Sequence, residues 1–410
     1  MFNVKTYWVV GMAFLGLLWA VTPSGAVNRD FAKIDTVRFG VLAPVQMVVG
    51  QGIINAAKLA AEEINAAGGI HGKKIEIIVG DTESKPEKGI TAMKKLVMED
   101  KVDVLVGEYN SGVALAIQPF LGNYKIVLIS TGTASTDLTN NVKKDYQKNK
   151  YFFRHMINSD RMELVAHKFL KEFAHGKLGC KKFAILAENA KWTEDYGKDL
   201  KKDLEKDGLE VVLYERFDVE LKDFSPIFSK IKSLGTQWIF ELVSHGASIP
   251  LVKAWQDNKP ALMGGANVGS MDSKFWGMTG GASLYESTYN MIARAPLTDR
   301  TIPFWDDYVK KFGSNPMYVS GFTHDAVYLI SEVMKQKKSV KSDDIVAGLE
   351  TISFKGVLHP QTGFDKQTHD LLEGRYVMPF VQWQAGGKQV VFYPEKFKTG
   401  DYVKPAWWKP

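Results

Sequence analysis

Residues 37–69 read VRFGVLAPVQMVVGQGIINAAKLAAEEINAAGG and contain a complete strand–loop–helix unit. Val37–Ala43 is predominantly apolar, as expected for a strand that is buried in a parallel sheet. From Gly52 to Ala67, apolar residues recur with the 3.6-residue period of a helix. The pair Gly68-Gly69 ends that helix, since glycine is common directly after the last turn. The stretch therefore predicts a βα unit.

The same alternation of strands and helices continues along the chain and starts again after residue 160. Further strands are predicted at Ile75–Val79, Val102–Val106, Ile126–Ile129, Phe183–Ala187, Glu210–Tyr214 and Trp238–Phe240. In the second half, helices are predicted at about 161–174, 194–207, 223–234 and 247–257. Two βαβ series predict an α/β fold with two doubly wound parallel sheets.

Ligands of such sheets bind outside the carboxyl ends of the strands, where the chain leaves a strand for a helix. The loops at these positions are 44–51, 107–112, 130–136, 188–196, 242–247 and 265–270. We therefore expect any binding residues to be concentrated in these six segments.

The N-terminus has the features of a secretory signal, predicted at 1–26. Lys5 precedes an apolar run from Tyr7 to Val21, and small residues ending at Ala26 follow it. Cleavage after Ala26 would make Val27 the first residue of a soluble periplasmic protein. An uncleaved membrane anchor is the alternative, although the run is shorter than the roughly 20 apolar residues that span a bilayer. The single cysteine, Cys180, allows no intrachain disulfide.

Composition and motif searches exclude several classes of function. The net charge is 52 − 46 = +6, and the basic residues alternate with acids, as in Lys198–Asp207. This pattern is typical of solvated surfaces and gives no reason to expect nucleic-acid binding. The eight histidines lack metal-ligand spacing, and no P-loop, H-E-x-x-H or G-x-S-x-G motif occurs. We therefore predict no catalytic residue, no metal site and no cofactor.

The chain contains one near-match to a catalytic motif. The segment LVSHG at 242–246 resembles a nucleophile elbow that lacks its first glycine, so a serine hydrolase built on Ser244 is an alternative function. Three histidines elsewhere have simpler interpretations. His167 and His175 are predicted to lie on surface helices, and His155 in a hinge.

Five segments, taken in order, carry a family resemblance. They are VRFGVLAP at 37–44, EEINAAGGIHGKKIEI at 62–77, VDVLVGEYNSG at 102–112, STGTASTDLT at 130–139 and GFTHDAVYLI at 321–330. The set resembles type I periplasmic solute-binding proteins of ABC transporters, specifically the leucine/isoleucine/valine-binding branch. The resemblance implies a Venus-flytrap protein whose two lobes close on a ligand.

The resemblance also implies how the chain is divided between the lobes. Lobe I would comprise 35–154 and 291–362, and lobe II would comprise 155–290 and 363–410. Three crossings would form the hinge, near Phe153–Asn158, Tyr289–Arg294 and Gln361–Asp365.

Lobe I is expected to hold a carboxylate of the ligand. Ser111 lies where a strand gives way to a helix, and a hydroxyl beside the free N–H groups of a helix N-terminus suits an anion. The alternative is that Ser111 only caps the helix. The family's second hydroxyl position falls on Ala134, and Thr133 or Ser135 could replace it.

The neighbours of Ser111, which are Tyr109 and Asn110, are expected to line the side of the ligand. In lobe II, the resemblance points to an aromatic residue before a glycine, which Tyr196 matches. Trp192 in the same loop is a rival for that role, and the second tyrosine of the family aligns with Ser244.

One departure from the family leaves the ligand open. The acidic residue that receives the α-ammonium of an amino acid aligns with Ala266, next to Asn267. Either Glu188, Glu241 or Glu286 replaces it, or the ligand lacks an amino group. The loop at 44–50 is also shorter than in the family prototype.

The predicted function is therefore the capture of a small amino-acid-like, amide or carboxylate metabolite by a monomeric periplasmic protein. Its partners would be ABC permease subunits in the inner membrane, and no nucleic acid. An extracytoplasmic ligand sensor that presents the same flytrap to a receptor is the alternative.

Overall fold

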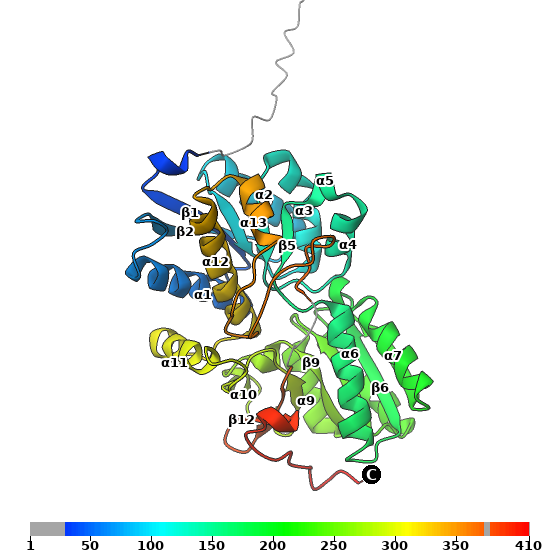
Figure 1. Cartoon of the computed structure of the whole chain (residues 1–410). Coiled ribbons are helices and arrows are strands. Elements are labelled where there is room, and N and C mark those ends of the chain that lie inside the picture. Colours follow the sequence, from blue (N-terminus) through cyan, green and yellow to red (C-terminus); the bar gives the residue numbers. More distant parts are fainter. Residues whose placement is uncertain (1–28, 373–377, 410) are drawn as a thin grey trace, which may run out of the picture.

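A computed structural model describes residues 29–372 and 378–409. The predicted signal at 1–26 and its cleavage site lie outside the described residues. Figure 1 shows two groups of elements, each built around a sheet. The first sheet is entirely parallel and has the order β2-β1-β3-β4-β5. Its strands are β1 (Thr36–Ala43), β2 (Lys74–Asp81), β3 (Val104–Gly107), β4 (Leu128–Ser130) and β5 (Phe152–Arg154).

The second sheet has the order β12-β11-β10-β9-β8-β6-β7, and its five strands from β6 to β10 repeat the order of the first sheet. These strands are β6 (Lys182–Glu188), β7 (Glu210–Phe217), β8 (Trp238–Val243), β9 (Leu262–Asn267) and β10 (Ser287–Tyr289). The predicted pair of doubly wound sheets is confirmed. The second sheet is not purely parallel, however, because β11 (Phe380–Gln384) and β12 (Lys388–Tyr393) add an antiparallel hairpin.

Helices pack against both faces of each sheet, so the central strands are buried and nearly continuously apolar. Around the first sheet lie α1 (Val48–Ala66), α2 (Pro86–Met98), α3 (Ser111–Tyr124), α4 (Asp137–Lys144), α5 (Tyr146–Asn149), α12 (Tyr318–Lys337) and α13 (Ser342–Leu349). Around the second lie α6 (Ser159–Phe169), α7 (Tyr196–Lys206), α8 (Ser225–Ser233), α9 (Ser248–Asn258) and α10 (Phe275–Met278). Helix α11 (Thr301–Phe312) precedes α12 in the chain.

Most predicted elements lie within a few residues of the observed ones. Five observed strands are not among the predicted ones: β5, β9, β10, β11 and β12. Two of them, β5 and β10, have only three residues each. The helix predicted at 161–174 is observed as α6 followed by a π-helical segment, Leu170–His175. His155 is fully buried between β5 and α6, where one ring nitrogen lies 3.1 Å from the carbonyl oxygen of Phe322.

The chain passes between the two sheets three times. It leaves the first sheet after β5, returns after β10 to place α12 against α1, and enters the second sheet again at β11. The residues at which the lobes divide, including the expected limits 35–154, 291–362, 155–290 and 363–410, stay a prediction.

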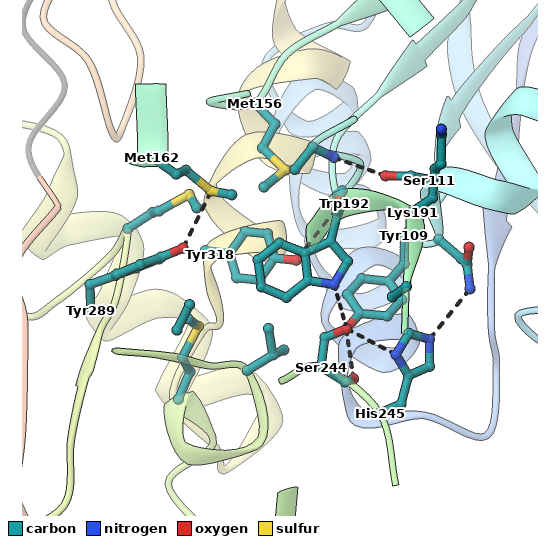
Figure 2. A pocket seen from close by; sticks show the side chains of 18 residues that line it. Tyr109, Ser111, Met156, Met162, Lys191, Trp192, Ser244, His245, Tyr289 and Tyr318 are labelled. Atoms are coloured by element: carbon teal, nitrogen blue, oxygen red, sulfur yellow. Dashed lines mark hydrogen bonds between the residues drawn. The ribbon is translucent and has the colours of Figure 1, made fainter. Parts of the chain in front are cut away.

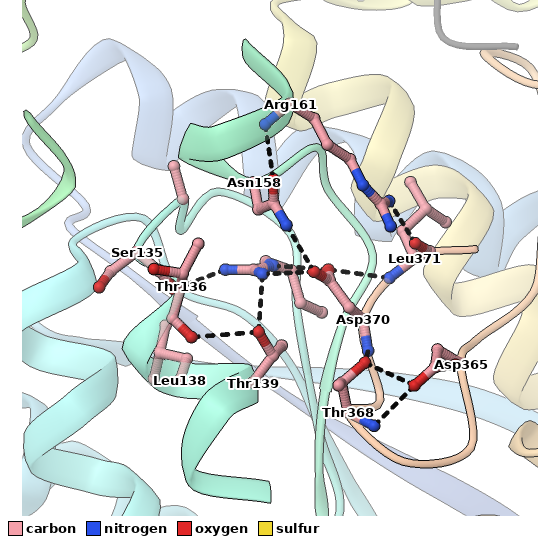
Figure 3. A network of polar contacts seen from close by, with 12 residues as sticks. Ser135, Thr136, Leu138, Thr139, Asn158, Arg161, Asp365, Thr368, Asp370 and Leu371 are labelled. Atoms are coloured by element: carbon pink, nitrogen blue, oxygen red, sulfur yellow. Dashed lines mark hydrogen bonds and ion pairs between the residues drawn. The ribbon is translucent and has the colours of Figure 1, made fainter. Parts of the chain in front are cut away.

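A buried ion pair connects the first and third passages (Figure 3). Both Nε and Nη2 of Arg154 donate to the carboxylate of Asp370, at 2.9 and 2.7 Å, and the Arg154 side chain is fully buried. The Arg154 backbone N–H donates to the carbonyl oxygen of His369 at 3.0 Å. The side-chain amide of Asn158 donates to the same Asp370 carboxylate at 2.8 Å. The strand-end segment and the returning chain are therefore joined by charge-assisted hydrogen bonds.

Arg154 also reaches the loop after β4. Its Nη1 donates to the carbonyl oxygen of Ser135 at 2.6 Å, and its Nη2 donates to Oγ1 of Thr139 at 3.0 Å. In this way one side chain fixes a candidate ligand-binding loop relative to the passages between the lobes.

No helix among the described residues combines the length and the apolar character needed to cross a membrane.

Replacing Asp370 tests this ion pair. The variant Asp370→Asn leaves the Arg154 charge buried without its carboxylate, which should lower the free energy of unfolding by about 3–5 kcal/mol. The matched control is Asp306→Asn, since Asp306 pairs with Arg294 on the surface, where both side chains are at least half exposed. That change should cost about 0–1 kcal/mol. Equal losses for the two variants in urea unfolding would contradict the structural role of Arg154–Asp370.

Candidate ligand-binding site

A cavity of about 500 Å³, counted with its opening to solvent, lies between the ends of the two sheets (Figure 2). Its walls come from the loops after β3, β4, β6 and β8 and from residues in or near β9, β10, α6 and α12. The lining residues are Tyr109, Asn110, Ser111, Gly132, Ala134, Met156, Met162, Ala190, Lys191, Trp192, Ser244, His245, Ala266, Val268, Met271, Tyr289, Met291 and Tyr318. This is the position at which α/β proteins bind small molecules.

A sharp turn after β3 directs three residues toward the cavity. Gly107 has a φ of +107°, and a Cβ there would lie 2.4 Å from the carbonyl oxygen of Leu42, so only glycine fits. Glu108 follows with a φ of 62°, and its buried carboxyl accepts a hydrogen bond from the backbone N–H of Asn110 at 2.8 Å. Tyr109, Asn110 and Ser111 are thereby held in one conformation.

Ser111 is the first residue of α3, and the helix cap is Asn110. The side-chain oxygen of Asn110 accepts from the backbone N–H groups of Gly112 and Val113, at 2.8 and 3.4 Å. The alternative that Ser111 only caps the helix is therefore wrong. Its Oγ instead accepts from the backbone N–H groups of Ala134 and Ser135, both at 3.2 Å. Because the oxygen is the acceptor in both bonds, the hydroxyl hydrogen is left to be donated to a ligand.

Six of the ten predicted site residues line the cavity. They are Tyr109, Asn110, Ser111, Ala134, Trp192 and Ser244. Whether these residues contact a ligand stays a prediction, and so does the choice among Thr133, Ala134 and Ser135 for the second anchoring position.

The other four predicted residues lie behind the wall. Thr133 is buried, with its hydroxyl 2.6 Å from that of Ser130, and Ser135 offers its backbone N–H to Ser111. Tyr196 is buried and donates to the carbonyl oxygen of Met162 at 3.1 Å. Asn267 is fully buried and donates to Glu286 at 3.1 Å.

Sequence reasoning missed the apolar part of the cavity. Met156, Met162, Met271 and Met291 line it together with Tyr289 and Tyr318. Figure 2 shows Met162 facing Tyr289, whose hydroxyl lies 3.6 Å from the methionine sulfur. Met162 and Tyr318 lie on α6 and α12, where the loop rule does not look. Met156, Tyr289 and Met291 lie at or after the ends of β5 and β10, two strands that the sequence did not predict, and Met271 lies one residue beyond the loop expected at 265–270. Sulfur and aromatic rings make a soft apolar surface that suits a flat ligand.

Among the described residues, no aspartate or glutamate side chain lines this cavity. Lys191 does line it, but its ammonium pairs with Asp137 at 2.8 Å and with Glu194 at 2.6 Å. The wall thus offers hydroxyl, amide and imidazole groups but no acceptor for a ligand ammonium comparable to a carboxylate.

The three glutamates that could replace the missing acid are buried behind the wall. Glu188 accepts from Nε1 of Trp192 at 3.0 Å and pairs with Nδ1 of His245 at 2.9 Å. Glu241 accepts from the backbone N–H of Gly265 at 3.1 Å, and burial together with nearby Glu286 raises its pKa well above the ordinary value. Burial raises the pKa of Glu286 to about 8. Glu241 and Glu286 are therefore poorly suited to hold a cation at neutral pH.

Ser244, His245 and Glu188 do not form a catalytic relay. In such a relay one imidazole nitrogen contacts the serine and the other contacts the acid. Here Nδ1 of His245 faces both groups, 3.0 Å from Ser244 Oγ and 2.9 Å from Glu188 Oε1. Ser244 itself donates to Glu188, and Nε2 of His245 lies 3.4 Å from the amide of Asn110. The geometry gives no support to a serine nucleophile.

Three polar contacts join the walls of the cavity across the gap between the sheets. Tyr109 donates to the carbonyl oxygen of Ser244 at 2.8 Å, and Asn110 meets His245. Lys191 meets Asp137. All three connect the loop after β3 or the start of α4 with the loops after β6 and β8.

Comparisons with known proteins agree with this architecture. A sequence model described as periplasmic binding protein matches residues 36–388. "Leu/Ile/Val-binding protein homolog 1" of Brucella suis is 28% identical over 343 residues, which cover 83% of this chain and 87% of the relative.

Two solved structures share the fold. One is a solute-binding protein of an ABC transporter from Rhodopseudomonas palustris in complex with 3,4-dihydroxybenzoic acid. It has a TM-score of 0.75 and 22% identity, and the match covers 90% of this chain and 99% of that one. The other is a branched-chain amino acid transporter substrate-binding protein from Streptococcus pneumoniae in complex with isoleucine. Its TM-score is 0.72 and its sequence identity is 23%, and the match covers 86% of this chain and 97% of that one.

The chain belongs to the periplasmic binding protein family. The resemblance read from the five sequence segments is thereby confirmed.

The Glu188–His245 pair predicts a pH window of stabilisation. Burial opposes the charge of His245, but Glu188 raises its pKa above the ordinary 6.5. Burial opposes the charge of Glu188 too, but His245 and Ser244 lower its pKa below the ordinary 4.5. The stabilisation is therefore full between these two ordinary values. It is lost as the pH rises through the raised pKa of His245, and as the pH falls through the lowered pKa of Glu188.

The variant His245→Gln tests this window. Within it, the change should lower the free energy of unfolding by about 1–3 kcal/mol, because Glu188 loses a buried partner. The loss should shrink above and below the window in urea unfolding measured across pH. His71→Gln is the control, because His71 is exposed and contacts a backbone carbonyl, that of Lys335. A pH-independent loss would show that the pair is not ionised.

Proposed function

We propose that the chain is the extracytoplasmic solute-binding component of an ABC importer and that it binds a small aromatic monocarboxylate in the cavity between its lobes. One observation carries the choice of ligand: the described cavity wall offers the Ser111 hydroxyl and a methionine- and tyrosine-rich surface, but no carboxylate.

The anchor proposed for the ligand carboxylate is Ser111. Its hydroxyl is oriented by two backbone N–H groups and lies at the N-terminus of α3, where the helix dipole favours negative charge. The ring of the ligand would pack among Met162, Tyr289 and Trp192. The Rhodopseudomonas protein of the same fold binds 3,4-dihydroxybenzoic acid, which supports an aromatic acid.

Branched-chain amino acids are the second candidate, favoured by the name of the Brucella relative and by the isoleucine complex of the Streptococcus protein. An α-ammonium in this cavity would have no carboxylate partner in the described wall. Since charge-assisted hydrogen bonds are about twice as strong as neutral ones, an amino acid would lose a large part of its binding energy.

Closure of the lobes is the proposed mechanism of capture. The contacts Tyr109–Ser244, Asn110–His245 and Lys191–Asp137 join the lobes only when the cavity is shut. A ligand that touches both walls adds binding energy to the same state and so shifts the population toward it. The hinge is proposed at the three passages, with the lobes divided at the predicted limits.

The proposed setting follows from the N-terminal signal and the family. Removal of residues 1–26 would release a monomeric periplasmic protein, and the closed pair of lobes would be recognised by ABC permease subunits. The proposed protein carries out no chemistry of its own. The alternative function, a ligand sensor, would use the same cavity. The partner protein distinguishes the two functions, because a sensor would bind a receptor and an importer component would bind a permease.

Ligand binding can be tested with a panel of benzoate, 4-hydroxybenzoate and leucine. We expect the benzoates to raise the melting temperature and leucine to have little effect. Ser111→Ala should then weaken benzoate binding by roughly 10- to 150-fold in calorimetry, since a hydrogen bond to a charged group contributes about 1.5–3 kcal/mol.

The matched control is Ser331→Ala. Ser331 is equally buried, but its hydroxyl bonds to the carbonyl oxygen of Val327 within α12, at 2.7 Å. Tight leucine binding without benzoate binding would overturn the proposed ligand class. Unchanged affinity in Ser111→Ala would overturn the anchor alone.

Lobe closure can be tested by small-angle scattering with 4-hydroxybenzoate. The radius of gyration should fall when the ligand binds. Tyr109→Phe removes the contact to Ser244 and should weaken binding by about 2- to 12-fold, the equivalent of a 0.5–1.5 kcal/mol hydrogen bond. Tyr124→Phe, at the far end of α3, serves as the control. An unchanged radius with bound ligand would exclude the hinge mechanism.

A further inference from the structure

A group of potential metal ligands lies between α6 and α7, outside the ligand cavity. Figure 1 shows these two helices side by side on the second lobe. Glu163 and His167 are four residues apart on α6 and so project from the same face. Asp203 comes from α7. One ligand atom from each of these three side chains lies within 4.8 Å of the other two.

Glu163 is a buried acidic residue with one side-chain oxygen that has no hydrogen-bond partner in the described chain. It is only 4% exposed, and among the described residues its Oε1 has no hydrogen-bond partner. Leaving a carboxylate buried and unpaired is costly. In the described chain, no lysine or arginine pairs with Glu163 or Asp203. A bound cation would supply the missing positive charge.

His167 is held in a way that suits a ligand. Its Nε2 lies 2.8 Å from Oδ2 of Asp207, and Lys171 holds the same carboxylate oxygen at 2.9 Å. A neutral imidazole that donates Nε2–H to Asp207 keeps its lone pair on Nδ1 for a metal ion. Metal-binding histidines commonly donate their other ring N–H to a carboxylate, which fixes the tautomer and the ring orientation.

We propose that Glu163, His167 and Asp203 bind one divalent transition-metal ion, with zinc as the best match, and that the ion ties α6 to α7. An imidazole combined with carboxylates suits zinc better than magnesium or calcium, which prefer oxygen ligands alone. Ligands about 2.0–2.2 Å from a tetrahedral ion are about 3.4 Å apart. Small side-chain rotations would close the site from its present spacing, and water would complete the coordination.

The sequence predicts no metal site, because the search for histidine and cysteine spacing ignores Glu163, and Asp203 is contributed by another helix. The pair Glu163 and His167 alone has little specificity. Only the packing of α6 against α7 brings the third ligand to it.

The test uses tag-free, chelator-treated protein and zinc chloride. Calorimetry should show one zinc ion per chain, and saturating zinc should raise the melting temperature by several degrees. Magnesium and calcium chloride should produce neither effect. Glu163→Gln and Asp203→Asn should abolish the response. Asp207→Asn, which alters the support of His167 and the pairing with Lys171 but none of the three proposed ligands, should weaken zinc binding by about 10- to 100-fold.

The control variant is His175→Gln, since His175 contacts the backbone carbonyl of Cys180 and should leave zinc binding unchanged. Without metal, Glu163→Gln should melt close to the wild type, because the amide has nearly the same shape as the carboxyl group. A variant that melts normally but no longer responds to zinc supports the site. Unchanged zinc binding in Glu163→Gln, or no binding by the wild type, would overturn the proposal.

Discussion

The buried ion pair between Arg154 and Asp370 is the constraint on which the arrangement of the sites depends. It fastens the end of β5 to the chain that returns near residue 370. Through the carbonyl oxygen of Ser135 it also reaches the loop whose N–H groups hold Ser111. Asn158 bonds to the same Asp370 and caps α6. The proposed anion anchor and the helix of the proposed zinc site therefore share one rigid support.

The cavity shows how a common fold can change its ligand. Lobe I has a hydroxyl at a helix N-terminus. This group can hold the carboxylate of a ligand whatever the remainder of the ligand is. On the opposite wall, where the family resemblance would place an acid, Ala266 lines the cavity together with methionine and tyrosine side chains. Losing one charged partner there removes the main reason for the cavity to prefer an amino acid. The choice of ligand class would then rest on few positions.

Periodicity and glycine placement allowed most of the fold to be predicted, because buried strands and amphipathic helices leave local patterns. Ser111 and Tyr109 could be predicted as site residues because they follow the carboxyl end of a predicted strand, where ligands of parallel sheets bind. The Arg154–Asp370 pair could not be predicted, since its partners are 216 residues apart in the chain. Met162 and Tyr318 were missed because they lie on helices α6 and α12, and Tyr289 was missed because the short strand β10 that it ends was not predicted. Such residues meet only through tertiary packing.

The central claim is that the natural ligand is an acid without an ammonium group. The most direct measurement is mass spectrometry of the small molecule extracted from protein purified from its native periplasm without added ligand. We expect an aromatic monocarboxylate that does not react with amine-labelling reagents. Recovery of leucine, isoleucine, valine or another α-amino acid at one per chain would contradict the claim.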